Sequence, residues 1–171
     1  MTESLKLALD EAMAYAAPFI EMECGGVILK SKEAEEYKFI PLLNKHKDTA
    51  KSAGLYEVDR TDFGKQVIPL LTSGYNNYAS FHTHPIGCDT NPSSIDFTKL
   101  FKGFPTNFIF SPSTKALSQY DFVPGTTMEE IFGSGKGGEN TLLFVENLED
   151  KLDGPKIESA WNLTKLRNEQ T

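Results

Sequence analysis

The sequence predicts a single domain of the α/β class, in which a central mixed β-sheet is flanked by helices. Three observations predict this. The chain has 171 residues, a length typical of one domain with a substantial hydrophobic core. Hydrophobic residues make up 39% of it and charged residues 24%, as in ordinary globular proteins. Strand-like segments alternate with helix-like segments, without an internal repeat or a clear domain break, although this order alone would also fit an α+β domain.

Helices are expected at both ends of the chain and in its middle. Residues 3–16 have hydrophobic side chains at three- and four-residue spacings, and Pro18 lies just past the expected end. The residues that make this pattern are Leu5, Leu9, Ala12, Met13 and Ala16. Further helices are predicted over residues 62–71, 93–101 and 156–167.

Strands are expected where short runs are rich in β-branched and aromatic residues or alternate in polarity. The predicted strands cover residues 24–30, 36–42, 55–59, 78–84, 107–112, 116–122 and 141–147. The first two are expected to form a hairpin, and the strands at 107–112 and 116–122 a second hairpin with its turn at Pro112 and Ser113. Residues 43–54 and 133–138 are expected to be loops because they are polar or rich in glycine.

The charge and the cysteine content exclude several classes of partner and location. The net charge is −7 and no long run of lysine and arginine is present, which argues against a nucleic-acid partner. No apolar stretch approaches the roughly 18 residues that a membrane helix needs. The chain begins without the features of a signal peptide, and Cys24 and Cys88 form no CxxC pair. The sequence therefore predicts a cytoplasmic protein with no nucleic-acid or membrane partner.

The segment His82-Thr83-His84-Pro85 is the strongest functional signal in the chain. Side chains two residues apart on a strand point to the same face of the sheet, so both imidazoles can reach one metal ion. A catalytic zinc site commonly takes three protein ligands and one water, and Asp96 lies twelve residues after His84. Ser93 and Asp96 share one face if a helix begins at Ser93, so the serine would lie beside the metal.

Other interpretations of these residues remain open. A Ser-x-x-Asp sequence before an apolar helix is also a variant of the capping box, and two histidines on a strand can be ordinary surface residues. Cys88, as a thiolate, could be a fourth ligand that closes the site, or it could be a free cysteine in an exposed loop. Cys24 is expected to be a small core residue, and His46 a solvated surface residue in a lysine-rich loop.

Taken together, these segments resemble the signature of the JAMM (MPN/JAB) zinc metalloprotease family. The downstream half matches as H-T-H-P at residues 82–85, seven further residues, and S-S-I-D at residues 93–96. The upstream half, a glutamate followed by glycine and an apolar strand, is similar to E-C-G-G-V-I at residues 23–28. The resemblance spans roughly residues 3–122 of one domain, and residues 123–171 form an extension of unknown role.

The resemblance implies a JAB/MPN-like (cytidine-deaminase-like) fold and a role for each site residue. His82, His84 and Asp96 would bind one Zn²⁺, which lowers the pKa of its bound water. Glu23 would take a proton from the water and deliver it to the leaving amine. Ser93 would donate a hydrogen bond to the oxyanion of the tetrahedral intermediate.

Glu21 competes with Glu23 for the role of the base. If this stretch is extended, both carboxylates point to the same face, so alternation does not distinguish them. The family's spacing from glutamate to glycine and two apolar residues selects Glu23 with Gly26, Val27 and Ile28.

The expected function is zinc-dependent hydrolysis of an amide or isopeptide bond in a protein or peptide substrate. A ubiquitin-like conjugate is one candidate substrate. Two alternatives remain: a catalytically inactive MPN-like scaffold that binds proteins, and a phage-tail or cell-wall peptide hydrolase with the same catalytic residues.

Overall fold

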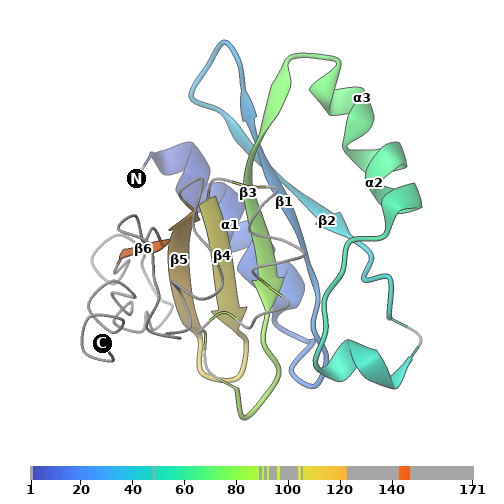
Figure 1. The fold of residues 1–171 in the computed structure, drawn as a ribbon. Helices are drawn as coiled ribbons and strands as arrows, with labels where there is room; N and C mark the ends of the chain where they lie inside the picture. Colours follow the sequence, from blue (N-terminus) through green and yellow to red (C-terminus); the bar gives the residue numbers. More distant parts are fainter. Residues whose placement is uncertain are drawn as a thin grey trace, which may run out of the picture.

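The chain folds around one six-stranded mixed β-sheet with helices on both faces (Figure 1). This computed structural model describes residues 2–47, 49–88, 90, 92, 96, 104 and 106–122, together with the backbone of residues 143–146. Its elements are α1 (Glu3–Ala16), β1 (Gly25–Ser31), β2 (Tyr37–Leu42), the 3-10 helix η1 (Ala50–Ala53), α2 (Arg60–Gln66), α3 (Ile68–Leu71), β3 (Tyr75–Thr83), β4 (Thr106–Ser111), β5 (Ala116–Phe122) and β6 (Leu143–Glu146). The predicted α/β class with a mixed sheet is confirmed.

The strands lie in the order β2-β1-β3-β4-β5-β6. Strands β1 and β2 form the first predicted hairpin, and β4 and β5 form the second. Strand β3 runs antiparallel to β1 but parallel to β4. Parallel neighbours need a crossover connection, so the chain must return from the end of β3 to the start of β4 between residues 84 and 105. Asp96 lies within this crossover.

One face of the sheet is covered by α1, which lies behind the strands in Figure 1. The helix begins as predicted: the Thr2 side chain accepts a hydrogen bond from the backbone N–H of Leu5 at 3.2 Å, an N-cap of the usual type. Its apolar stripe packs on alternate residues of the strands. The buried core on this face comprises Leu5, Ala8, Leu9, Ala12, Met13, Ala16, Cys24, Ile28, Phe39, Ala79, Phe81, Phe108, Phe110 and Leu117.

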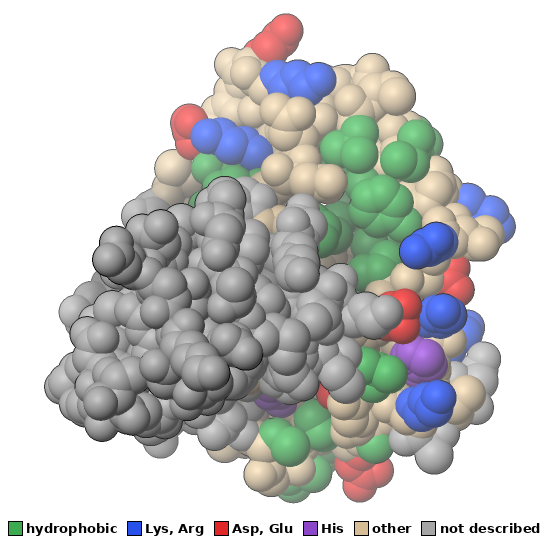
Figure 2. Space-filling model, in the orientation of Figure 1, with side chains coloured by type: hydrophobic (Ala, Val, Ile, Leu, Met, Phe, Trp, Pro, Cys, Tyr) green, Lys and Arg blue, Asp and Glu red, His purple; other side chains and the backbone are tan. Residues whose placement is uncertain are grey.

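The opposite face carries α2 and α3, and Figure 2 shows hydrophobic side chains gathered over this region, in the upper part of the view. The sequence predicted one helix over residues 62–71, but the structure has two short ones that meet at Val67. Pro69 explains the break, because a proline inside a helix has no N–H to donate and its ring crowds the preceding turn. The core here is formed by Val27, Leu29, Leu42 and Val67, with partly buried Ile40, Val58, Phe63, Leu70, Leu71, Tyr75 and Phe104.

The strand predicted at residues 55–59 is wrong, since this segment forms only an isolated bridge between Asn44 and Val58. Its alternating pattern has another cause: Tyr56 is buried in the core as part of a connection. The strand predicted at 141–147 is confirmed as β6. The helix predicted at 156–167 and the loop predicted at 133–138 lie outside the described residues, as does most of the helix predicted at 93–101.

No helix in the described part of the chain has the length and apolarity that crossing a bilayer requires.

The two glycines that open β1 allow the neighbouring strands to approach closely. A Cβ on Gly25 would lie 2.2 Å from the carbonyl oxygen of Phe81 and 2.9 Å from Cα of His82. A Cβ on Gly26 would lie 2.1 Å from the carbonyl oxygen of Ile40 on the other side. Gly25 is paired with His82 in the β1–β3 register. A side chain at Gly25 would therefore displace the strand that carries the first candidate ligand.

We expect Gly25→Ala to lower the free energy of unfolding by about 1–3 kcal/mol, the usual cost of forcing extra atoms into a packed interior. Chemical denaturation of the metal-free protein measures this. The matched control is Gly64→Ala in α2, where a Cβ meets no atom within 4 Å. Alanine should stabilise that helix by up to about 1 kcal/mol. If the two substitutions changed the free energy of unfolding by the same amount, the close approach of β1 and β3 would be contradicted.

Candidate metal centre

Both histidines of the motif lie at the end of β3 on the same face of the sheet. His82 is fully buried, and His84, one residue beyond the strand, is 8% exposed. Their ring centroids lie 5.2 Å apart. Thr83 points to the opposite face, as predicted, where its hydroxyl oxygen accepts a hydrogen bond from the backbone N–H of Cys24 at 3.0 Å. The alternation of an extended chain therefore places the two imidazoles together.

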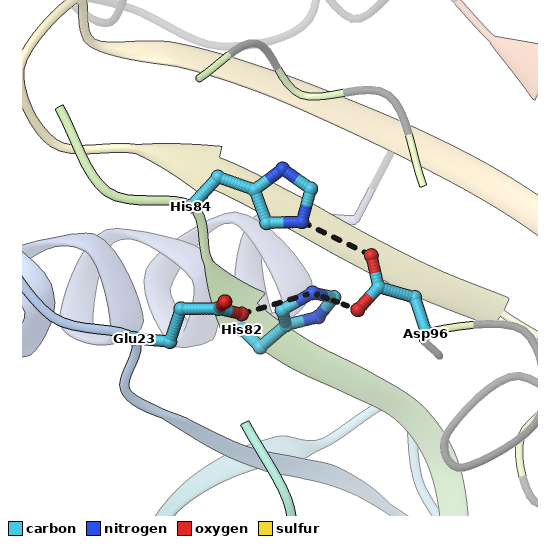
Figure 3. Close-up of side chains that lie close together, drawn as sticks. All are labelled: Glu23, His82, His84 and Asp96. Carbon is cyan, nitrogen blue, oxygen red and sulfur yellow. Dashed lines mark hydrogen bonds and ion pairs between the residues drawn. The ribbon is translucent and has the colours of Figure 1, made fainter. Parts of the chain in front are cut away.

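Asp96 approaches these imidazoles from the crossover between β3 and β4 (Figure 3). Its Oδ1 lies 3.1 Å from Nε2 of His82, and its Oδ2 lies 3.0 Å from Nε2 of His84. The contact with His84 is a hydrogen bond. The carboxylate is buried, and one residue thus faces both histidines at once.

Hydrogen bonds join Thr90 and Phe104, the described residues on either side of Asp96, to strands β4 and β5. Before Asp96, the Thr90 hydroxyl is 2.6 Å from the Ser118 hydroxyl, and the Tyr120 hydroxyl donates to the carbonyl oxygen of Thr90 at 2.6 Å. After Asp96, the side-chain amide of Asn107 donates to the carbonyl oxygen of Phe104 at 3.0 Å. These contacts fix Thr90 and Phe104, which lie on either side of Asp96 in the chain, to the sheet.

Glu23 completes the cluster from the segment that leads into β1. It is 5% exposed, and its Oε1 lies 4.0 Å from Nε2 of His82. Its backbone is held on both sides: its N–H donates to the carbonyl oxygen of Ser52 at 2.7 Å, and its carbonyl oxygen accepts from the Asn44 side chain at 3.2 Å. Glu21, the competing glutamate, is exposed to solvent. The structure therefore brings Glu23, and not Glu21, to the histidines.

The four side chains fit a metal ion of the zinc type. One donor atom from each lies within 4.8 Å of all the others. In a tetrahedral zinc site with bonds of about 2.0–2.2 Å, neighbouring ligand atoms are about 3.3–3.6 Å apart, so Asp96 and the imidazoles need to move only slightly. Two imidazoles and a carboxylate are ligands that zinc commonly takes.

Buried polar atoms without a hydrogen-bond partner are a second feature of the cluster that fits a bound cation. Among the described residues, the buried atoms Oε1 of Glu23 and Nδ1 and Nε2 of His82 have no hydrogen-bond partner. The distance from Nε2 of His82 to Asp96 is short, but the atoms lack the alignment that a hydrogen bond needs. Buried polar atoms without a partner destabilise a fold, and a bound cation would give Nε2 of His82 one.

The two carboxylates of the cluster differ in their affinity for protons. Burial alone would raise the pKa of Asp96, but the two imidazoles close to its carboxylate outweigh this effect and hold the pKa well below its usual range. Burial raises the pKa of Glu23, against an opposing effect of the two histidines, and the negative charge of Asp96 raises it further. Asp96 is thus suited to remain an ionised ligand, and Glu23 holds a proton more tightly than an ordinary glutamate does.

The other residues singled out in the sequence lie apart from this cluster. Ser93 lies outside the described residues. Cys88 is exposed and is not among the grouped metal-binding side chains, whereas Cys24 is a buried core residue, as predicted, and burial raises the pKa of its thiol to about 11. The prediction for His46 is wrong in part, because its ring is half-buried and Nε2 lies 3.2 Å from a carboxylate oxygen of Glu57.

Sequence patterns did not indicate the residues that support the cluster. Asn44 and Ser52 hold the backbone of Glu23, and Tyr56 packs on the ring of His82. Asn44 and Ser52 belong to a polar segment without periodicity, and the alternation around Tyr56 predicted a strand and not a contact with His82. The adjacent glycines at the start of β1 were visible in the sequence, but their close approach to β3 was not.

Glu23→Gln should increase the stability of the metal-free protein at pH 7. A carboxyl whose pKa is raised by folding binds its proton more tightly in the folded state, so above the unfolded value of about 4.3 its ionisation favours unfolding. Glutamine removes this penalty, and the gain should vanish at about pH 4, where both states are protonated. Urea denaturation at the two pH values measures the effect. The exposed Glu21→Gln should show no such pH-dependent gain, and a Glu23→Gln effect that is equal at both pH values would contradict the argument.

Comparison with known proteins supports the fold but supplies no function. No protein-family profile matches the chain, and no curated protein sequence matches it. The solution structure of a Desulfitobacterium hafniense protein is similar, with a TM-score of 0.54 and 19% identity over 70% of this chain and 82% of that one. A Salinibacter ruber protein gives a TM-score of only 0.43 at 18% identity over 72% and 81% of the two chains. The first likeness extends to the α/β fold alone.

Proposed function

We propose that this protein is a zinc-dependent hydrolase of amide or isopeptide bonds, similar to the JAMM metallopeptidases. The observation that carries the proposal is the convergence of Glu23, His82, His84 and Asp96 in one buried cluster. Three separate parts of the chain contribute to it: the segment before β1, the end of β3 and the crossover after it. The residues that meet are the glutamate and the three ligands of the sequence signature.

In the proposed site, Nε2 of His82, Nε2 of His84 and the Asp96 carboxylate hold the metal. When bound, zinc lowers the pKa of a water ligand toward neutrality and polarises the substrate carbonyl. Glu23 accepts the proton of the attacking water on its carboxylate and later donates it to the nitrogen of the leaving amine. The C–N bond breaks, and one water is consumed for each new carboxylate and amine.

The raised pKa of Glu23 supports this double role. A carboxylate with an ordinary glutamate pKa would be a weak base toward the proton of the attacking water near pH 7. Burial raises the pKa of Glu23 and so makes its carboxylate a stronger base. Ser93 remains the proposed hydrogen-bond donor to the oxyanion, on the strength of its place in the sequence signature.

Exposed apolar side chains close to the cluster support a peptide or protein substrate. Ile20, Met22 and Ile86 are 39%, 38% and 59% exposed, and each lies within three residues of Glu23 or His84 in the chain. A hydrogen bond of 2.7 Å from the N–H of Ile86 to the carbonyl oxygen of Ile20 brings the two segments together. A polypeptide bound across the site would cover these side chains.

The direct test is incubation of the untagged protein with a panel of ubiquitin-like conjugates and peptidoglycan peptides, with a mass-spectrometric readout. We expect cleavage of an amide or isopeptide bond with the uptake of one water, loss of cleavage after chelation, and recovery on adding zinc. A protein that holds about one zinc per chain but cleaves no member of the panel would instead favour a binding scaffold.

A further inference from the structure

The ring of Tyr56 lies parallel to the imidazole of His82. The two planes differ by 6° and the ring centroids are 6.1 Å apart, within the range of offset stacking. Tyr56 is 1% exposed, and its hydroxyl donates to the carbonyl oxygen of Leu42 at 3.1 Å. The tyrosine is therefore held at both its hydroxyl and its ring, and it presents one rigid flat face to the histidine.

In the described part of the chain, no group makes the contact with His82 that usually orients a metal-binding histidine. Such a residue normally donates its second ring N–H to a carboxylate, a carbonyl or a water, which fixes the ring plane. Nδ1 of His82 is buried and has no hydrogen-bond partner among the described residues. Among the described residues, packing is therefore what restricts rotation of the imidazole, and Tyr56 supplies a flat surface for that packing.

We infer that Tyr56 is a positioning residue, which sets the plane of the His82 imidazole and so aims Nε2 at the metal. Its effect on metal binding rests on the proposed function. Its effect on the ring plane does not, because the stacking is a property of the metal-free protein.

The segment that carries Tyr56 also positions Glu23. The Asn44 side chain donates to the carbonyl oxygen of Leu55 at 2.8 Å and to that of Glu23 at 3.2 Å. The carbonyl oxygen of Ser52 accepts from the N–H of Glu23 at 2.7 Å. Asn44, Ser52 and Tyr56 therefore position both the proposed ligand His82 and the proposed base Glu23, although the segment that carries them has little regular structure.

The test compares Tyr56→Phe, which keeps the ring, with Tyr56→Leu, which removes it. In the metal-free proteins, NMR should show ring-current shifts of the His82 ring protons in the wild type and in Tyr56→Phe, and their loss in Tyr56→Leu. Titration with Co²⁺ should give a wild-type-like affinity for Tyr56→Phe and an affinity about 10- to 100-fold weaker for Tyr56→Leu. Phe108→Leu is the matched control, because it removes an equally buried ring from the opposite face of the sheet.

Circular dichroism verifies that each variant is folded. If Tyr56→Leu does not fold, Tyr56→Met replaces it, and nuclear Overhauser effects between the Tyr56 and His82 rings test the contact in the wild type itself. Unchanged His82 shifts and Co²⁺ affinity in the ring-less variant, or an equal loss in Phe108→Leu, would overturn the inference and leave the proposed function standing. A wild type that binds no Co²⁺ would overturn the proposed function, while the ring-current comparison would still decide the role of Tyr56.

Discussion

His82→Ala and His84→Ala are each expected to lose most of the bound metal, while the folded domain survives. The wild type should hold about one zinc per chain, and each variant should retain less than about a fifth of it, because a site with three protein ligands loses a third of its donors. Metal analysis of untagged protein after gel filtration measures this.

The third histidine supplies the control for metal binding. His46 pairs with Glu57 outside the cluster, so His46→Ala should keep its zinc. Circular dichroism separates loss of the metal from loss of the fold. Full zinc retention in the His82→Ala, His84→Ala double variant would remove the assignment of the metal centre, whatever the activity.

Glu23→Gln is expected to bind zinc normally and to lose nearly all hydrolysis. Glutamine keeps the size of the side chain but cannot take the proton of the attacking water. Removal of a general acid–base group costs about 10²- to 10⁴-fold in rate, and we expect kcat/KM to fall by that factor. Zinc content, melting temperature and turnover should be measured on one preparation.

Glu21→Gln is the matched control for the base, since it makes the same chemical change two residues away on an exposed side chain. It should leave turnover near the wild-type value. A variant pair in which Glu21→Gln abolishes hydrolysis and Glu23→Gln does not would show that the base is wrongly assigned, although the metal ligands could still stand. Loss of zinc in Glu23→Gln would make Glu23 a ligand and not a base.

Local patterns were sufficient for most of the fold. Helix α1 and strands β1, β2, β4 and β5 were predicted within one or two residues. Burial on one side gives α1 a period in the sequence, whereas β1 and β4 are buried on both faces and appear as short runs rich in apolar residues. The failures lie where one residue overrides the pattern. Pro69 divides the predicted helix into two, and the alternating segment around Tyr56 forms an isolated bridge instead of a strand.

The sequence by itself determined that His82 and His84 occupy one face of the sheet, where they can share a metal ion. The two histidines needed only the alternation of β3, which is a local property of an extended chain. Their meeting with Asp96 and Glu23 depends on the parallel pairing of β3 with β4 and on the contacts that hold the residue 44–56 segment, which only the tertiary structure decided. The opposite pKa shifts of Glu23 and Asp96 arise from those long-range contacts. Burial raises the pKa of Glu23, whereas the two imidazoles beside Asp96 lower its pKa against the effect of burial, and both effects depend on what packs around a group and not on its neighbours in the chain.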